Sequence, residues 1–150
     1  MNLTKQQQID ILHLDIATSY ATQSKAVRNK VGALIVTRQG VIVPGYNGTP
    51  PNWDNTCETY SEDGSLITKP EVVHAELNAI FKCAKEGIST LGATAYVTLS
   101  PCVPCSSAIA CCGFERVVYK EQYRILDGIQ NLIDNGHSVT YLGEYFESQT

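Results

Sequence analysis

Residues 94–105, TAYVTLSPCVPC, carry the pattern on which the predicted fold depends. Thr94 to Leu99 is a short apolar run, which is typical of a buried strand. Pro101 and Pro104 follow, and proline is tolerated in the first turn of a helix because the N–H groups there have no helical partner. The stretch therefore predicts a strand that leads directly into a helix, and this helix is expected to end at Gly113.

Cys102 and Cys105 lie at positions i and i+3 at the start of this predicted helix. Both thiols can reach one ion there, and the partial positive charge of a helix N-terminus favours thiolates. Upstream, His74-Ala75-Glu76 offers an imidazole and a carboxylate. A structural zinc usually takes four protein ligands, whereas a hydrolytic zinc keeps one position open for water. The order H-x-E…P-C-x-x-C is the signature of zinc-dependent nucleobase deaminases, in which the Glu is not a ligand.

Each part of the pattern also has a plainer interpretation. A C-x-x-C pair alone favours a structural zinc or a redox site, and a lone His-x-Glu is a weak signal. A closed structural site needs a fourth ligand, but no other cysteine pairs with a second His at a ligand-like spacing. We interpret Cys111 and Cys112 as small buried apolar residues. The two motifs together, in this order, favour a catalytic site.

Composition limits the class of protein. The 150 residues, with 43% hydrophobic content, are expected to form a single domain spanning residues 1–150. No apolar run is long enough for a membrane span, and the polar start of the chain does not resemble a signal peptide. Six cysteines in such a chain indicate a reducing cytoplasm rather than a disulfide framework. A net charge of −4 argues against a nucleic-acid partner but allows a small anionic ligand.

The rest of the chain alternates between predicted helices and strands. Residues 4–24 predict a helix that starts with a capping box of Thr4 and Gln7. Its expected buried stripe is Ile9, Leu12, Ile16 and Tyr20. Strands are expected at 31–37, 41–46, 116–119 and 138–142, and helices at 74–86 and 125–135. The 74–86 helix should end at Gly87, with a core stripe of Leu77, Ile80, Phe81 and Ala84. Segment 47–73 is expected to be a long functional loop.

This order predicts a three-layer α/β/α fold. A five-stranded mixed sheet is expected, with the first two strands antiparallel, the later strands parallel and helices on both faces. Both metal motifs would then lie at neighbouring helix N-termini. Arg28 and Asn47 would face one edge of the sheet, where an arginine fork suits a phosphate and the amide can donate a further bond. Arg28 as a solvated helix end is the alternative.

With the motifs placed in this way, the chain resembles the cytidine deaminase superfamily and, within it, the deoxycytidylate (dCMP) deaminases of phage and cellular type. The resemblance covers about residues 20–123. It is carried by four blocks of sequence: Ser24–Val36, Gly45–Pro50, His74–Ile80 and Tyr96–Cys102. The last two blocks indicate the superfamily, and the Gly-Tyr-Asn-Gly block with the extended helix block favours the dCMP branch.

The resemblance implies a reaction and roles for particular residues. Zinc would be held by His74, Cys102 and Cys105, while Glu76 would shuttle protons during the hydrolytic deamination of dCMP to dUMP and ammonia. The product would supply dTMP synthesis. By resemblance, the backbone N–H of Ala75 would hold the pyrimidine O2, and Tyr123 would join Arg28 and Asn47 at the phosphate.

The resemblance also implies regulation. Members of this type are commonly hexamers, activated by dCTP and inhibited by dTTP at a second nucleotide site with Mg²⁺. The matching positions are Asn29, Lys30, Gly45, Tyr46, Gly48 and Glu58. A plain Asn-Gly turn is the rival explanation for the loop at Gly48. Some phage relatives carry a second, structural zinc, but this chain has Lys25 where a Cys would be needed, so we do not expect one.

Two other functions compete with this prediction. The first is a different deaminase on the same scaffold, acting on cytosine, cytidine or tRNA adenosine; the acidic charge and Arg28 oppose the tRNA version. The second is a zinc-stabilised module that binds deoxynucleotides without turnover. Glu76 opposes this second alternative, because a binding module has no need of a proton shuttle.

Overall fold

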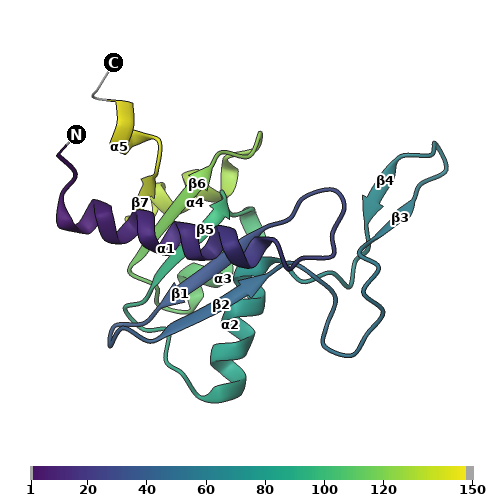
Figure 1. Cartoon of the computed structure of the whole chain (residues 1–150), viewed down its shortest axis with the longest axis horizontal. Helices are drawn as coiled ribbons and strands as arrows, with labels where there is room; N and C mark the ends of the chain where they lie inside the picture. Colours follow the sequence, from purple (N-terminus) through teal and green to yellow (C-terminus); the bar gives the residue numbers. More distant parts are fainter. Residues whose placement is uncertain (1, 148–150) are drawn as a thin grey trace.

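The computed structural model describes residues 2–147 and contains a five-stranded mixed sheet with the strand order β2-β1-β5-β6-β7 (Figure 1). The strands are β1 (Gly32–Val36), β2 (Ile42–Tyr46), β5 (Thr94–Leu99), β6 (Arg116–Glu121) and β7 (Ser138–Tyr141). β1 pairs antiparallel with both β2 and β5, whereas β5, β6 and β7 run parallel. The predicted three-layer α/β/α architecture is confirmed.

Helices cover both faces of this sheet. They are α1 (Lys5–Ala21), α2 (Ala75–Glu86), α3 (Val103–Cys111), α4 (Asp127–Asp134) and the short α5 (Glu144–Glu147). In Figure 1, α1 crosses one face of the sheet, and α2 and α3 lie behind the other. Within residues 2–147, no helix is long and apolar enough to cross a membrane.

Alternation along the strands creates one apolar core on each face. Leu34, Tyr96 and Val118 point toward α1 and form one core cluster with residues of that helix. The neighbouring positions Ile35 and Val117 belong to the other cluster, with residues of α2, α3 and α4. Successive side chains of a strand point to opposite faces, so one run of strand residues serves both cores.

The helix ends follow the predicted local signals. Thr4 caps α1, because its hydroxyl accepts from the Gln7 N–H while the Gln7 side chain accepts from the Thr4 N–H. Gly87 ends α2 in the left-handed conformation at φ 68°, and its N–H donates to the Cys83 carbonyl. His74 and Cys102 are the N-cap residues of α2 and α3, so each metal motif begins a helix as expected.

The predicted buried stripes of the two long helices are only partly right: Ile80 is buried, and Leu77 and Ile16 are partly buried against the core, but the other fully buried positions differ. Helix α1 buries Asp10, Leu14, Ala17 and Ala21 instead, and Leu12 is 55% exposed. Helix α2 buries Ala75, Glu76, Ala79, Ile80 and Cys83, and Phe81 is 53% exposed. The reason is close backbone contact: a Cβ on Gly32 would lie 1.9 Å from the carbonyl oxygen of Ala17, so only a small-residue face of α1 fits there. Cys111, expected to be buried, is exposed.

Segment 47–73 is not an irregular loop throughout. It contains a small antiparallel hairpin of β3 (Glu58–Tyr60) and β4 (Leu66–Thr68), which projects away from the main sheet in Figure 1. The Asp63 carboxylate accepts from the Ser65 N–H in its turn, and Gly64 has φ +83°. Asp-Gly between two short segments that contain strand-favouring Thr, Tyr and Ile residues is a hairpin signal that the sequence analysis missed.

Candidate active site

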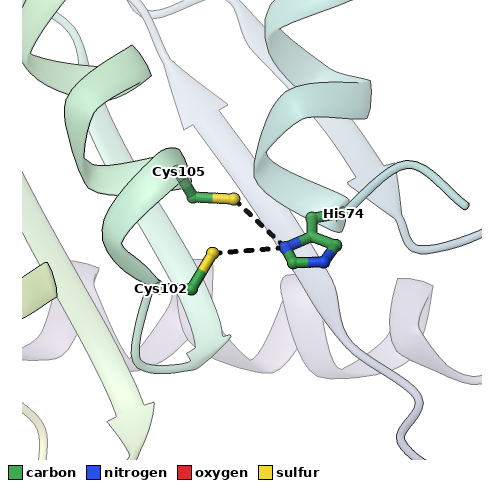
Figure 2. Close-up of side chains that lie close together, drawn as sticks. All are labelled: His74, Cys102 and Cys105. Carbon is green, nitrogen blue, oxygen red and sulfur yellow. Dashed lines mark hydrogen bonds between the residues drawn. The ribbon is translucent and has the colours of Figure 1, made fainter. Parts of the chain in front are cut away.

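The two metal motifs meet where α2 and α3 begin. His74 Nδ1 lies 3.4 Å from Cys102 Sγ and 3.3 Å from Cys105 Sγ, as Figure 2 shows. Strand β5 delivers Cys102 to the start of α3, and one helical turn places Cys105 beside it. His74 arrives from the neighbouring helix with an extended backbone.

The arrangement of these three side chains fits a zinc ion. Their ligand atoms all lie within 4.8 Å of one another. Tetrahedral zinc with ordinary Zn–S and Zn–N bonds places sulfur and nitrogen about 3.6 Å apart, close to the separations found here. One imidazole and two thiols form a donor set suited to zinc, and three protein ligands leave a fourth position for water.

Hydrogen bonding already favours a thiolate at this point. The bond from the Cys105 thiol lowers the pKa of Cys102 to about 4, and the bond with His74 acts in the same direction. The pKa of His74 is raised, chiefly by that same bond to Cys102. The site therefore holds negative charge on sulfur, which is the form that binds a metal.

Glu76 is the second residue of α2, and the residue is only 6% exposed. Burial raises the pKa of its carboxyl group, because the charged form loses hydration. A raised pKa brings a carboxyl group closer to the range in which it both accepts and releases protons near neutral pH. Glu76 therefore has the environment of a general acid–base.

A cavity of about 260 Å³ opens beside these groups. Its walls include every residue predicted to contact substrate, together with Glu76 and two residues of the metal motif: Arg28, Asn47, His74, Ala75, Glu76, Cys102 and Tyr123. These positions come from five separate parts of the chain. The structure thus brings the predicted phosphate-binding residues and two of the three predicted zinc ligands, His74 and Cys102, to one cavity.

Asn47 makes contacts different from those expected of it. Its Oδ1 accepts from the Val31 N–H at 2.8 Å, and its Nδ2 donates to the Asn29 carbonyl at 2.8 Å. The Asn47 carbonyl in turn accepts from the Ser24 hydroxyl at 2.8 Å. Asn47 therefore holds the segment that carries Arg28, in addition to lining the cavity.

Two polar residues of the cavity wall, Ser100 and Thr68, were missed by sequence reasoning. Ser100 is buried, and its Oγ accepts from the Tyr123 N–H at 2.8 Å, which fixes the loop after β6. Thr68 lines the cavity from β4 and accepts from the Arg28 guanidinium at 3.2 Å. Thr68 carried no signal, because the hairpin that positions it was not predicted.

Two of the residues assigned to an effector site by resemblance have structural contacts. A Cβ on Gly45 would lie 2.4 Å from the Ala75 carbonyl oxygen, so Gly45 permits close packing of β2 against α2. Glu58 is 8% exposed, and its carboxylate accepts from the Val27 N–H. These contacts explain both residues without a bound nucleotide.

Of the remaining effector candidates, only Asn29 lines the cavity. Lys30 is exposed. Gly48 pairs with Val73, and the Lys82 ammonium lies 6.0 Å from the centre of the Tyr46 ring. Their roles in effector binding stay predictions.

The fold has a mixed sheet between layers of helices, and it places His-x-Glu and Cys-x-x-Cys at adjacent helix N-termini. These features together define a hydrolytic deaminase of the zinc-dependent type. Residues 7–121 match the family model described as the cytidine and deoxycytidylate deaminase zinc-binding region. The chain belongs to that family.

Curated relatives and solved structures agree with this assignment. The chain is 35% identical to the deoxycytidylate deaminase of Enterobacteria phage T4, over 73% of this chain and 76% of that protein. It is 41% identical to the deoxycytidylate deaminase of Mycobacterium phage D29, over 75% of this chain and 94% of that protein. The dCMP deaminase of cyanophage S-TIM5, solved with dCMP and dUMP, superposes with a TM-score of 0.82 at 39% identity, covering 93% and 99% of the two chains.

Proposed function

We propose that this protein catalyses the hydrolytic deamination of dCMP to dUMP and ammonia. One observation carries the proposal: a single cavity joins the His74 and Cys102 metal motif and Glu76 to the guanidinium of Arg28. A cation and a metal site with an acid–base in one cavity suit a nucleotide, which carries both a phosphate and a base. Relatives named deoxycytidylate deaminase support the choice of dCMP.

The chemistry follows from the positions of these groups. Zinc held by His74, Cys102 and Cys105 would supply the Lewis acidity that lowers the pKa of a water molecule. Glu76 takes one proton from the water that attacks C4 and passes it to N3 of the ring. It then takes the remaining proton of the new C4 hydroxyl and delivers it to the amine, which leaves as ammonia while the C4 carbonyl forms. Burial of Glu76 keeps bulk water away from this proton route.

Binding groups around the cavity orient the substrate. The N–H of Ala75 lies in the first turn of α2, where N–H groups have no partner within the helix, and it holds the pyrimidine O2 in this proposal. Arg28 binds the phosphate through its planar fork, and Tyr123 also lines the cavity. Nucleosides and free bases lack the phosphate, so Arg28 favours the nucleotide.

The finer parts of the proposal rest on resemblance alone. They are activation by dCTP, inhibition by dTTP, Mg²⁺ accompanying the effector, a hexameric assembly, and supply of dUMP for dTMP synthesis in the cytoplasm. Titration of the zinc-loaded protein with dTTP, while a dCMP analogue saturates the cavity, tests the separate effector site. Binding of two nucleotides per chain supports it, and strict competition for one site rules it out.

The central test is ammonia release by zinc-loaded protein from dCMP, deoxycytidine, cytosine and AMP. We expect dCMP to be the best substrate, and we expect chelation of zinc to abolish turnover until zinc is restored. Turnover of deoxycytidine or cytosine in preference to dCMP would replace this proposal with a nucleoside or base deaminase. Nucleotide binding without release of ammonia would instead support the non-catalytic nucleotide-binding module.

A further inference from the structure

The β3–β4 hairpin meets the segment that joins α1 to β1. Residues 24–31 of that segment form neither helix nor strand, so no helix or sheet ladder fixes their position. Arg28 lies in this irregular stretch, and its side chain is the cation of the cavity wall. A binding residue on irregular backbone depends on its partners for precise placement.

One rung of the hairpin holds two consecutive residues of the segment. Glu58 and Thr68 are directly opposite each other in the β3–β4 ladder. The Glu58 carboxylate accepts from the Val27 N–H at 2.7 and 3.1 Å, and Thr68 Oγ1 accepts from the Arg28 guanidinium at 3.2 Å. The rung therefore contacts both the backbone just before Arg28 and the head group of Arg28.

The two rung residues differ in exposure, because Glu58 is buried whereas Thr68 is exposed. Glu58 is 8% exposed, although a short hairpin strand offers a carboxylate easy access to water. A buried carboxylate needs hydrogen bonds, and the Val27 N–H is the donor it has here. Thr68 lies at the cavity wall beside Arg28. The rung thus connects the hairpin to the cavity.

We propose that Glu58 and Thr68 are positioning residues that aim Arg28 at the substrate phosphate, so that the hairpin determines selection of nucleotide over nucleoside. This inference rests on the proposed dCMP deaminase function and deepens it. The rung touches neither the metal motif nor Glu76, so it acts on phosphate recognition and leaves the chemistry at the base unchanged. Glu58 then has a role in the substrate site rather than in a separate effector site.

Paired variants test the two contacts. Thr68→Val keeps the shape of the side chain but removes the acceptor, whereas Thr68→Ser keeps the hydroxyl. Glu58→Leu removes both acceptor oxygens, whereas Glu58→Gln keeps one oxygen for the Val27 N–H. Tyr60→Thr, at a 75% exposed position of the same strand, is the matched control.

We expect a split between kinetic constants and between substrates. For zinc-loaded protein, Glu58→Leu and Thr68→Val should each raise KM for dCMP about tenfold, a typical loss for a misplaced charged hydrogen bond, with kcat little changed. KM and kcat for deoxycytidine should stay within about twofold of wild type, because that substrate has no phosphate. Glu58→Gln, Thr68→Ser and Tyr60→Thr should behave like wild type.

A double-mutant cycle tests whether the rung acts through the guanidinium. Once Arg28→Ala has removed the phosphate contact, Glu58→Leu should cause no further loss on dCMP. Calorimetry provides a readout without turnover: Glu58→Leu should weaken binding of dUMP but not of deoxyuridine. Additive losses in the cycle contradict the inference.

The outcomes distinguish failure of this inference from failure of the proposed dCMP deaminase function. Suppose that wild type prefers dCMP, but that Glu58→Leu and Thr68→Val lower activity on dCMP and deoxycytidine equally, or lower neither. The positioning role is then wrong, and the proposed function stands. If Glu58→Leu does not fold, the KM values of Thr68→Val and Thr68→Ser for dCMP decide whether the rung positions Arg28. If wild type shows no preference for dCMP over deoxycytidine, the proposed function fails, and the inference fails with it.

Discussion

At the scale of single residues, the site divides its tasks between groups that hold a metal and a group that moves protons. Cys102 and Cys105 lie within hydrogen-bonding reach of His74 and have the donor chemistry for zinc. Glu76 stands beside them, buried and with a raised pKa, but lies outside the three-residue cluster that can hold an ion. Substitutions should therefore separate loss of metal from loss of proton transfer.

Glu76→Gln should retain zinc and fold but lose deamination by about 10² to 10⁴-fold, because the amide cannot accept and return a proton. Cys102→Ala should instead lose zinc, because it removes one of the three ligands. Metal content by emission spectroscopy and turnover of dCMP, measured on the same samples, distinguish the two effects. Near-normal turnover by Glu76→Gln would show that the proton route is wrong.

Arg28→Ala should weaken dCMP turnover far more than deoxycytidine turnover. A charge-assisted hydrogen bond is worth about 1.5–3 kcal/mol, which corresponds to a loss of about 10- to 100-fold in kcat/KM for dCMP. Lys25→Ala, an exposed cation in the same segment that is absent from the cavity wall, is the control. Equal losses on both substrates would show that Arg28 is structural.

At the scale of elements, close contact between backbones fixes where α2 begins. A Cβ on Gly45 of β2 would lie 2.4 Å from the Ala75 carbonyl oxygen and 2.8 Å from the Ala79 nitrogen. These atoms belong to the first turns of α2, next to His74 and Glu76. The spacing between β2 and α2 therefore sets the position of the catalytic helix relative to α3.

Gly45→Ala should lower the free energy of unfolding by about 1–3 kcal/mol, because backbone atoms must move to admit the methyl group. The displaced start of α2 should also weaken zinc binding. Gly48→Ala is the matched control, since a Cβ there meets no atom within 4 Å. Denaturant titration measures the free energy of unfolding, and competition with a chromogenic zinc chelator measures zinc affinity. Equal values for the two variants would contradict the role of the Gly45 contact in positioning α2.

At the scale of the whole molecule, an ion pair with a fully buried carboxylate joins the first helix to strand β6. Asp10 of α1 is fully buried and accepts from the Arg116 guanidinium at 2.7 and 2.6 Å and from the Tyr96 hydroxyl at 2.8 Å. The Tyr145 hydroxyl of α5 also donates to Asp10. Residues distant in the sequence thus meet at one carboxylate.

This network gives stability a defined pH dependence. Burial alone would raise the pKa of Asp10, but the hydrogen bonds from Arg116, Tyr145 and Tyr96 outweigh it, and the net effect is a pKa below the ordinary 3.8. A carboxyl group with a lowered pKa in the folded state stabilises the protein fully above its ordinary pKa. That contribution is lost as the pH falls through the lowered value.

Asp10→Asn should therefore cost about 3–5 kcal/mol at neutral pH, because it leaves the Arg116 charge without its counter-ion in a largely buried site. The difference from wild type should narrow as the pH falls below the ordinary value of 3.8. Asp15→Asn, at an exposed position of the same helix, is the control. Unfolding by urea at several pH values provides the measurement, and a constant difference across the series would contradict the linkage.

The sequence by itself determined the chemistry and the order of elements. The metal motif, the Thr4 capping box and the Gly87 helix end each depend on residues that are close together in the sequence. Their spacing is therefore enough to predict the local structure. Strand β5 and the helix after Cys102 followed from the same local rules. From the order of elements, connection rules were sufficient to predict the mixed sheet.

Only the tertiary structure decided which faces are buried and what surrounds the substrate cavity. The buried face of α1 follows from the backbone contact between Gly32 and Ala17, and the positions of Thr68 and Ser100 follow from contacts between segments far apart in the chain. Such contacts depend on shape and distance in three dimensions rather than on local spacing. Asn47 shows the difference: its place at the cavity was predictable, but its bonds to residues 29 and 31 were not.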